Sequence, residues 1–538
     1  MKAYINPFKI SNILFLVFVF SGCESYLKEN NPSEVTTDFL YTTADGLQAA
    51  VNGLYTIERA QFDDSESSPT VLIYGDGGTD LDFNRAADAT VTRYDLVTNL
   101  ATRSTISGWW QKFYRIIERS NSIITFGEQA DIDADDKKAI LRNAYIYRAY
   151  AYFWLVRKYD NIWLNTEPTT YENISGRTFT PAAQADVYEQ IIADLDKALE
   201  YYGTDWTVVQ GQFNQGVARL LRAEVALWQK DYQTAAAQAT KIISEGPFAL
   251  EATENVWAKD RRRNTKEGMY VIQWDEFSPG GGGDHRFARA FTAQYRSVPG
   301  CISSPEFGGY GWARLHPNPY FLSLFDKKYD KRYNAWFQHF YLYNDPTYDF
   351  SKLSYKFGDT LRVNQNSWTK GDNMYRSMNV GTKKYWDWEK EPLASESYNN
   401  IYIYRYPLVL FIAAEAYMHL EPDNVKALSY INQIRQNRIL STSPNQLLTT
   451  LNEDILLEEY ARELGLEGHR WFLLKRMGKL VERVQKYGGV SEFLGVKATS
   501  TYYQCRTNIK PYHVRWPIPQ SELDAMGSSF PQNEGYLQ

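Results

Sequence analysis

Residues 451–479 constrain the fold of this chain more than any other stretch. In the first half, apolar residues recur at helical spacing, and Glu458 and Arg462 stand one turn apart on the polar side. Gly465 and Gly468 end that helix, and a second apolar helix is expected to follow. Because each helix leaves an apolar face for the other and its neighbours to cover, the stretch predicts a stacked helical pair. A plain helical hairpin is the alternative.

The same stretch resembles the late motif of the SusD/RagB family of surface lipoproteins, which reads roughly E-R-x-x-E-L-x-x-E-G-x-R-W-x-D-L-x-R. Two positions depart from it: Tyr460 stands where the family usually has Arg, and Leu473 where it usually has Asp. We expect packing to replace a polar link there. The matching residues are Glu459, Glu463, Leu464, Glu467, Gly468, Arg470, Trp471, Leu474 and Arg476.

Length and composition limit the class of protein. A chain of 538 residues exceeds one compact core of ordinary size, which predicts two or more domains or one elongated repeat array. Aromatic residues make up 15%, and so many amphipathic rings suit a surface that binds sugars or partners as well as helix contacts. The formal charge of −6 argues against nucleic acid as the main partner.

Residues 1–22 are expected to be a lipoprotein signal peptide that is removed. Lys2 and Lys9 precede an apolar run over residues 13–20, which is too short to span a bilayer, and small residues then lead directly to Cys23. This spacing resembles a bacterial lipoprotein cleavage site, which would make Cys23 the lipidated N-terminus that anchors the protein to a membrane. The alternative is a secreted protein without lipid.

The other cysteines and the histidines give no sign of a metal site. Cys301 and Cys505 are far apart in sequence, and two free thiols are the preferred interpretation, although a disulfide stays open. The chain has no C-x-x-C or H-x-x-H spacing, and isolated histidines beside aromatic residues usually have structural roles. No metal is expected.

Helical periodicity covers much of the remaining sequence. Residues 218–227, followed by Asp231, Tyr232 and Ala235, resemble a tetratricopeptide unit with small residues at the helix crossing. The predicted fold is therefore mainly α, a tetratricopeptide-like helical repeat scaffold with an irregular loop-rich capping region. The expected helices cover residues 44–60, 109–126, 137–159, 185–202, 212–229, 232–244, 406–420 and 424–438.

The capping region is expected over residues 251–400, where periodicity gives way to Pro, Gly, Asn and aromatic residues. A short strand is predicted at residues 270–274, and so long an irregular segment points to a role of its own. The predicted organisation is an N-terminal part with helical repeats (23–250) and a RagB/SusD part (251–538), whose last section (401–538) is helical. The closing W-P-I-P and Q-N-x-G-Y motifs extend the family resemblance to nearly the whole mature chain.

Two segments contain candidate ligand-binding residues. By the resemblance, the ligand face is built partly from the N-terminal region, where Tyr74, Asp80, Asp82, Arg85 and Tyr94 stand close together in sequence. Closely spaced aspartates can accept hydrogen bonds from several sugar hydroxyls, and the arginine can donate back. The resemblance implies only the location, since the family has no residue-level motif for ligand contact.

The second segment is the cap, where Trp274 stands beside polar residues and Tyr310 and Trp312 stand beside Arg314. The apolar C–H faces of sugar rings stack on aromatic side chains, while the hydroxyls require polar partners at the rim. These three rings are therefore predicted to bind ligand. A place in the protein core is the alternative for each single ring.

The acidic segment does not have the spacing of either of two other kinds of site. Glycoside hydrolysis needs two carboxyls about 5–10 Å apart across a cleft, a separation that residues as close in sequence as Asp76, Asp80 and Asp82 would reach only by accident. A calcium loop would need ligands over twelve residues ending in Glu, and that spacing is absent. No enzyme activity and no cofactor are expected.

The resemblance implies an outer-membrane lipoprotein of a Bacteroidetes-type bacterium, facing the outside of the cell. Such a protein binds an oligosaccharide or polysaccharide and delivers it to a SusC-like TonB-dependent transporter. The alternatives are a binder of peptides or another nutrient, as in the RagB branch, and a glycoside hydrolase.

Overall fold

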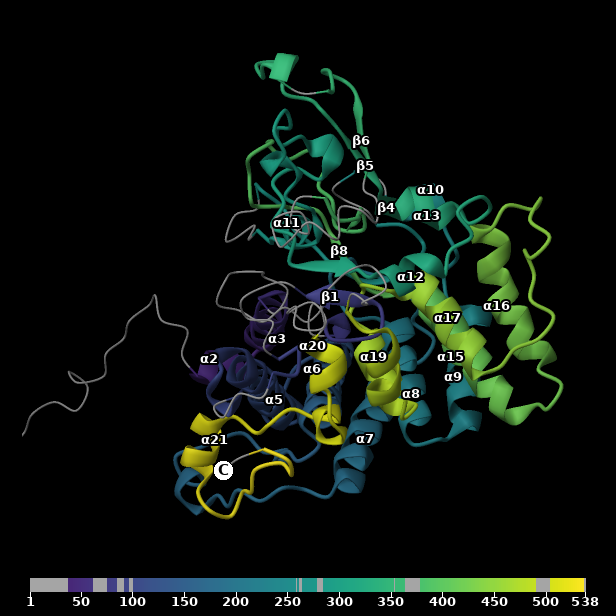
Figure 1. Cartoon of the computed structure of the whole chain (residues 1–538). Coiled ribbons are helices and arrows are strands. Elements are labelled where there is room, and N and C mark those ends of the chain that lie inside the picture. Colours follow the sequence, from purple (N-terminus) through teal and green to yellow (C-terminus); the bar gives the residue numbers. More distant parts are fainter. Residues whose placement is uncertain are drawn as a thin grey trace, which may run out of the picture.

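The computed structural model describes residues 37–60, 75–84, 91–95, 100–257, 259–260, 264–277, 284–352, 354–362, 378–489 and 504–536. The expected signal peptide and Cys23 lie outside these residues. Figure 1 shows packed helices below a loop-rich region, so the mainly α fold predicted from sequence is confirmed. Among the described helices, none is both long and apolar enough to cross a membrane.

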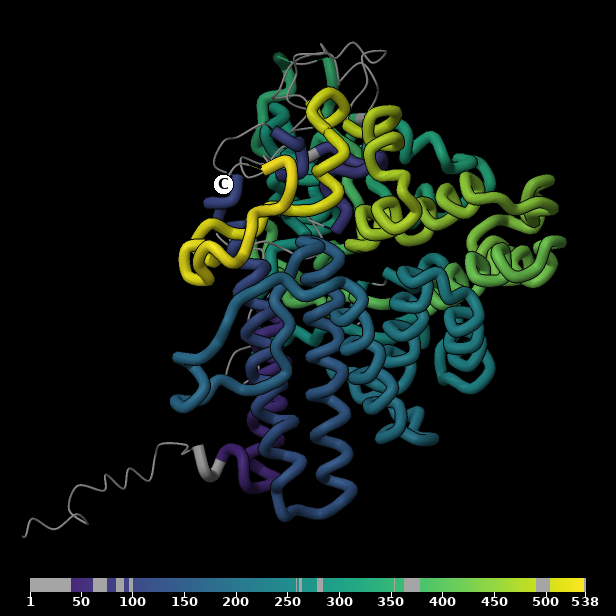
Figure 2. The backbone as a smooth tube through the Cα atoms, turned by 90° about the horizontal axis from the view of Figure 1, so that it is seen from below, coloured from purple at the N-terminus to yellow at the C-terminus, as the bar shows by residue number. Residues whose placement is uncertain are grey.

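The N-terminal helices pack on one another in chain order. Helix α3 packs on α5, α5 on α6, α6 on α7, α7 on α8 and α8 on α9. The longest of them run side by side in Figure 2. The predicted helices of this half are confirmed with small shifts at their ends. The elements are α2 (Thr37–Thr42), α3 (Ala44–Arg59), η2 (Leu100–Thr102), α5 (Ser104–Gln129), α6 (Ala134–Tyr159), η3 (Ile174–Gly176), α7 (Gln184–Tyr202), α8 (Gln215–Trp228) and α9 (Tyr232–Glu245).

Helix α6 is the centre of this half. Residues 149–159 of α6 are all buried, because α3 and α5 cover part of the helix and α7 and α8 cover the rest. The helix begins after Asp133, whose side chain accepts hydrogen bonds from the amides of Asp135 (2.8 Å) and Asp136 (3.3 Å). Alternation of small and aromatic side chains thus fits the C-terminal part of this helix, which is enclosed on all sides, whereas its first turn is exposed.

The helical array continues into the C-terminal half. Helix α15 (Tyr406–Leu420) packs against α8 and α9, and it also contacts α16 (Val425–Arg438) and α17 (Glu453–Leu464). Residues almost 200 positions apart in sequence therefore form one stack of helix pairs, as the predicted repeat scaffold requires.

The cap consists of short elements, of which some bury side chains in the main hydrophobic core and others surround a small separate core. That core contains Ala293, Tyr295, Cys301, Phe307, Tyr341 and Tyr343. The elements are α10 (Thr253–Val256), β2 (Gly268–Ile272), α11 (Phe287–Phe291), η4 (Tyr295–Ser297), η5 (Pro305–Phe307), β3 (Leu315–Pro317), α12 (Pro319–Ser323), α13 (Lys331–Trp336), β4 (Phe337–Gln338), β5 (Phe340–Leu342), η6 (Phe350–Lys352), β6 (Thr360–Arg362), β7 (Gly381–Thr382) and β8 (Ile401–Arg405).

The strands of the described chain form two-stranded antiparallel sheets that join distant segments. Strand β1 (Asp82–Asn84) pairs with β3, β2 with β8, β4 with β7 and β5 with β6. The predicted strand at 270–274 is β2, which begins and ends two residues earlier. It ends early because the amide of Trp274 bonds the side chain of Asn400 (2.9 Å) in place of a partner strand.

The motif stretch forms the expected pair of helices. Helix α17 ends just before Gly465, and α18 (Arg470–Arg476) follows Gly468, as the sequence predicts. Tyr460 is buried against Phe411, with ring centroids 4.9 Å apart, and Leu473 is also buried, so both departures from the motif are accommodated by packing. The chain continues with α19 (Leu480–Tyr487), α20 (Gln504–Asn508), η9 (Pro511–Val514) and α21 (Gln520–Met526). Cys301 and Cys505 are free, buried thiols.

Candidate functional site

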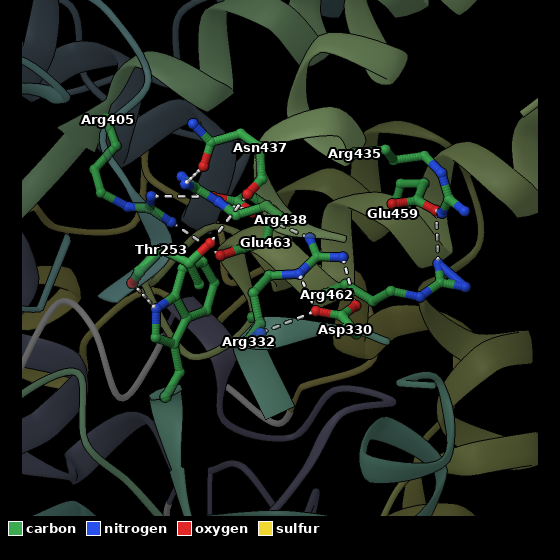
Figure 3. Close-up of polar contacts among 12 residues, drawn as sticks. Thr253, Asp330, Arg332, Arg405, Arg435, Asn437, Arg438, Glu459, Arg462 and Glu463 are labelled. Atoms are coloured by element: carbon green, nitrogen blue, oxygen red, sulfur yellow. Dashed lines mark hydrogen bonds and ion pairs between the residues drawn. The ribbon is translucent and has the colours of Figure 1, made fainter. Parts of the chain in front are cut away.

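The acidic residues of the late motif lie in a buried ion network, which Figure 3 shows in close-up. Glu463 is fully buried and accepts hydrogen bonds from Arg332 (3.0 Å), Arg405 (3.2 Å) and Arg438 (3.0 Å). Burial opposes ionisation of Glu463, but the three guanidinium groups outweigh it and hold its pKa below the usual range. This part of the motif therefore holds the helices and the cap together rather than facing a ligand.

Glu467 extends the network. Its carboxylate accepts hydrogen bonds from Lys384 (2.5 Å) and from Arg405 (2.7 Å). Both oxygens of Glu267 bond Arg438 at 2.9 Å. Every one of these side chains is almost completely buried, and each charge faces an opposite charge. Such pairing is what makes buried ions tolerable.

Asp76 and Asp80 bind the same motif from the N-terminal side. Asp76 accepts hydrogen bonds from the amides of Gly468 and Arg470, at the start of α18. Both oxygens of Asp80 bond Arg470 (2.8 and 2.7 Å), and one also bonds Arg483 (2.7 Å). Burial opposes ionisation of Asp80, but these arginines lower its pKa. Asp80, predicted to meet sugar hydroxyls, is in fact wholly buried and is engaged by residues nearly 400 positions away.

Asp82 and Tyr94 form hydrogen bonds with the nearby residues Gly78 and Thr79. The Asp82 carboxylate accepts hydrogen bonds from the amides of Gly78 (3.2 Å) and Thr79 (2.9 Å), and burial raises its pKa to about 8. The Tyr94 hydroxyl donates to the Gly78 carbonyl at 2.6 Å. Asp82 and Tyr94 are thus buried beside Asp80, and none of the three side chains faces solvent. Tyr74 and Arg85, the other candidates of this segment, lie outside the described residues.

Trp274 is also inside the protein. Its side chain is 6% exposed and lies edge-on to His285 (centroids 5.2 Å apart), and the guanidinium of Arg59 lies 5.5 Å from its centroid. The structure therefore places it with the core, the alternative stated for each single ring.

Tyr310 and Trp312 differ from the other candidates because both are only half-buried. The guanidinium of Arg296 lies 4.1 Å from the Tyr310 ring centroid. Those of Arg289 and Arg314 lie 3.3 and 4.6 Å from the Trp312 centroid. Because Arg289 is itself buried, it supports the indole from the protein side, while the Trp312 residue as a whole stays partly exposed. We refer to Tyr310 and Trp312 with these three arginines as the cap platform.

The cap platform has the chemistry of a stacking site with a polar rim. The rings provide flat apolar surface, and the guanidinium groups provide hydrogen-bond donors beside it. The sequence pointed to Tyr310, Trp312 and Arg314, but not to Arg289 and Arg296, which stand on other turns of the cap upstream of the rings. No periodic pattern could have found them.

The carboxylates of the described chain do not assemble into a metal site: no three or more His, Cys, Asp or Glu side chains gather in a way that could hold an ion. In the segment compared above with a calcium loop, the carboxylates accept hydrogen bonds from backbone amides and arginine side chains. This arrangement stabilises the fold through internal hydrogen bonds.

The fold defines a helical-repeat protein with a loop-rich cap. The chain belongs to the SusD family, whose profile matches residues 256–536, more than half of its length. A second profile, described as starch-binding and associating with the outer membrane, matches residues 25–227.

Individual relatives agree with this assignment. SusD-like protein P2 of Formosa agariphila is 26% identical, with 99% of this chain and 100% of the relative covered. A SusD homolog from Bacteroides thetaiotaomicron superposes with a TM-score of 0.72 at 20% identity, over 93% of this chain and 99% of that one. Surface glycan-binding protein A from the same species, solved in complex with laminarihexaose, superposes with a TM-score of 0.65 at 18% identity, over 91% and 99%. At such identities the structural likeness establishes the fold.

Proposed function

We propose that this protein binds an oligosaccharide or polysaccharide at the outer membrane and delivers it to a SusC-like TonB-dependent transporter. Ligand capture of this kind requires a shaped surface and no covalent step, so the proposal makes the chain a binding protein and not an enzyme. Lipidation at Cys23 would hold it on the membrane, facing the outside of the cell.

The cap platform is the observation that carries the proposal. Of the three candidate aromatic residues of the cap, Tyr310 and Trp312 are the two that stay partly exposed, and they stand two residues apart beside three arginines. A sugar ring can place its C–H face on such a surface and its hydroxyls against the more exposed guanidinium groups of Arg296 and Arg314. The match to a starch-binding, outer-membrane profile and the laminarihexaose complex of a protein with the same fold support a glycan as the ligand.

The test is calorimetric titration of the mature protein with a panel of neutral glycans that includes laminarihexaose and maltohexaose. The double variant Tyr310→Ala/Trp312→Ala should weaken binding at least about tenfold, which corresponds to a loss of about 1.4 kcal/mol. Its melting temperature should fall little, because half-exposed rings contribute less to the core than buried ones.

Phe357 offers a matched control, because it is another aromatic residue of the cap and is 59% exposed. Phe357→Ala should bind as the parent does. Unchanged affinity in a folded double variant would remove the cap platform from the site, and binding of peptides in place of glycans would favour the RagB-like alternative.

The anchor and the partner have separate tests. Cys23→Ala should abolish labelling by a radioactive fatty acid, and continued labelling would contradict lipidation at this residue. Mild detergent extraction of a C-terminally tagged protein should recover a large barrel protein with it. Recovery of the tagged chain alone under several mild conditions would count against a transporter partner.

A further inference from the structure

A groove of about 500 Å³ lies between α5, residues 163–179 and α21, away from the cap. None of its lining residues belongs to the cap platform. Its walls include the rings of Trp110, Tyr114, Trp163 and Phe179, and Met526 of α21 also lines it. The volume falls within the range of small-molecule sites, roughly 300–1,000 Å³.

The aromatic walls are held in place by their own contacts. The Tyr114 hydroxyl donates to the carbonyl of Trp163 and accepts from its amide, both at 2.8 Å. The rings of Trp163 and Phe179 pack with centroids 4.8 Å apart, and α21 packs on α5. The groove is therefore formed in advance, which lowers the entropic cost of binding.

The charged side chains that line the groove differ in whether the protein itself supplies them with a hydrogen-bond partner. Glu522 accepts a hydrogen bond from Gln111 (2.8 Å), and Glu118 accepts one from the amide of Thr169 (2.6 Å). Arg115, an exposed residue of α5, has no hydrogen-bond or ion-pair partner among the residues that the structure describes. One oxygen of each carboxylate thus has an uncharged protein donor, whereas this guanidinium is left to solvent.

Arg177 adds a second cation. One of its five N–H donors bonds the carbonyl of Glu167 (3.2 Å), and its guanidinium lies 5.5 Å from the Trp163 ring centroid. Arginine recognises a carboxylate through two parallel hydrogen bonds, which makes it the side chain best suited to a planar anionic group. The groove therefore offers apolar stacking surface together with donors for an anion.

We propose that this groove is a second carbohydrate site that takes an acidic sugar, a uronate residue of a glycan. The aromatic walls would take the C–H face of the sugar ring, and Arg115 and Arg177 would bind its carboxylate. The inference rests on the proposed function as a glycan binder and adds a ligand class to it.

The test is calorimetric titration of the mature protein with trimers of galacturonate and of mannuronate. We expect at least one of them to bind, and Arg115→Gln to weaken that binding by about tenfold or more. Ala525→Trp should abolish it, because Ala525 is an exposed residue of α21 that lines the groove and a larger side chain there fills the space without disturbing a core. Arg103→Gln is the matched control, since Arg103 is an exposed arginine at the start of the same helix and does not line the groove.

The outcomes separate this inference from the glycan-binding proposal. Groove variants should leave the affinity for neutral glycans unchanged, whereas Tyr310→Ala/Trp312→Ala should leave uronate binding unchanged. Parent-like uronate binding in both groove variants, or its loss in the cap platform variant alone, would overturn the groove as the site. Failure of both uronate trimers to bind, while a neutral glycan binds, would overturn the acidic-sugar assignment and leave the proposed function standing. Failure of every glycan would overturn both.

Discussion

The buried ion network and the cap platform use arginine in opposite ways. In the network, the guanidinium of Arg405 is desolvated, and the carboxylates of Glu463 and Glu467 hold it in place. In the cap platform, arginines stack on the rings of two residues that stay partly exposed. The difference teaches that the best-matching family motif forms internal ion pairs of the fold, whereas the proposed binding surface lies in a segment without a regular sequence pattern.

Removing one charge at the centre of the network should have the largest effect. Glu463→Gln leaves Arg332, Arg405 and Arg438 without their shared carboxylate, and breaking a buried ion pair from one side costs about 3–5 kcal/mol. Urea denaturation of the mature protein should show a correspondingly lower midpoint.

Glu458→Gln is the matched control on the same helix. Glu458 pairs with Arg462 at 3.2 Å on the surface, where such a pair contributes below about 0.5 kcal/mol. Equal midpoints for the two variants would show that the network does not stabilise the fold.

Glu58 provides a contrast with the ion network, because this buried carboxylate is hydrogen-bonded to tyrosines and not to arginines. It accepts hydrogen bonds from Tyr147 (2.7 Å) and Tyr270 (2.5 Å), and burial raises its pKa from 4.5 to about 7. The folded state therefore binds the proton more tightly. The stabilisation is fully present below pH 4.5 and is lost as the pH rises through 7, at about 1.4 kcal/mol per pH unit within that window.

Glu58→Gln should remove this contribution. Relative to the parent, the variant should gain stability on the order of 3 kcal/mol between pH 4.5 and pH 8, measured as the difference between their urea unfolding free energies. A difference that does not change with pH would show that Glu58 is not protonated in the folded protein. The network carboxylates should show the opposite pH dependence of stability. Because the pKa values of Glu463 and Glu467 are lowered in the folded protein, their stabilisation is lost on acidification.

The smallest effect is expected at the cap platform. Arg314→Gln removes one guanidinium from Trp312 but leaves buried Arg289 in place, so the cost should be about 0.5–1 kcal/mol. A melting curve tests this, with Arg296→Gln at Tyr310 as a parallel surface change. A loss well above 2 kcal/mol would mean that Trp312 belongs to the core of the cap.

Local sequence pattern predicted the helices well, because their determinants lie within one or two turns. The segment predicted as a helix at 137–159 forms α6, which begins three residues earlier at the Asp133 cap, and the two glycines of the motif separate α17 from α18 as expected. Strand β2 was located within two residues, although its partner β8 stands some 130 positions away.

The candidate site was harder to predict, because exposure depends on distant partners. Asp80 and Asp82 looked like hydroxyl acceptors in a polar loop, yet Asp80 is buried against two arginines of the C-terminal part. No pattern near Asp80 reveals Arg470. In the same way, the spacing of Tyr310 and Trp312 was visible, but the arginines that support them come from elsewhere in the cap.

The contact between Asp80 and Arg470 also dictates the order in which the molecule can fold. The two residues stand 390 positions apart, so the N-terminal loop has no counter-ion until most of the chain has been synthesised. Helices such as α5 and α6 can form and pair early, because their contacts are local. The loop around Asp80 instead gains its arginine partners only when the last fifth of the polypeptide is present. In a chain truncated before Arg470, that carboxylate would have neither of them.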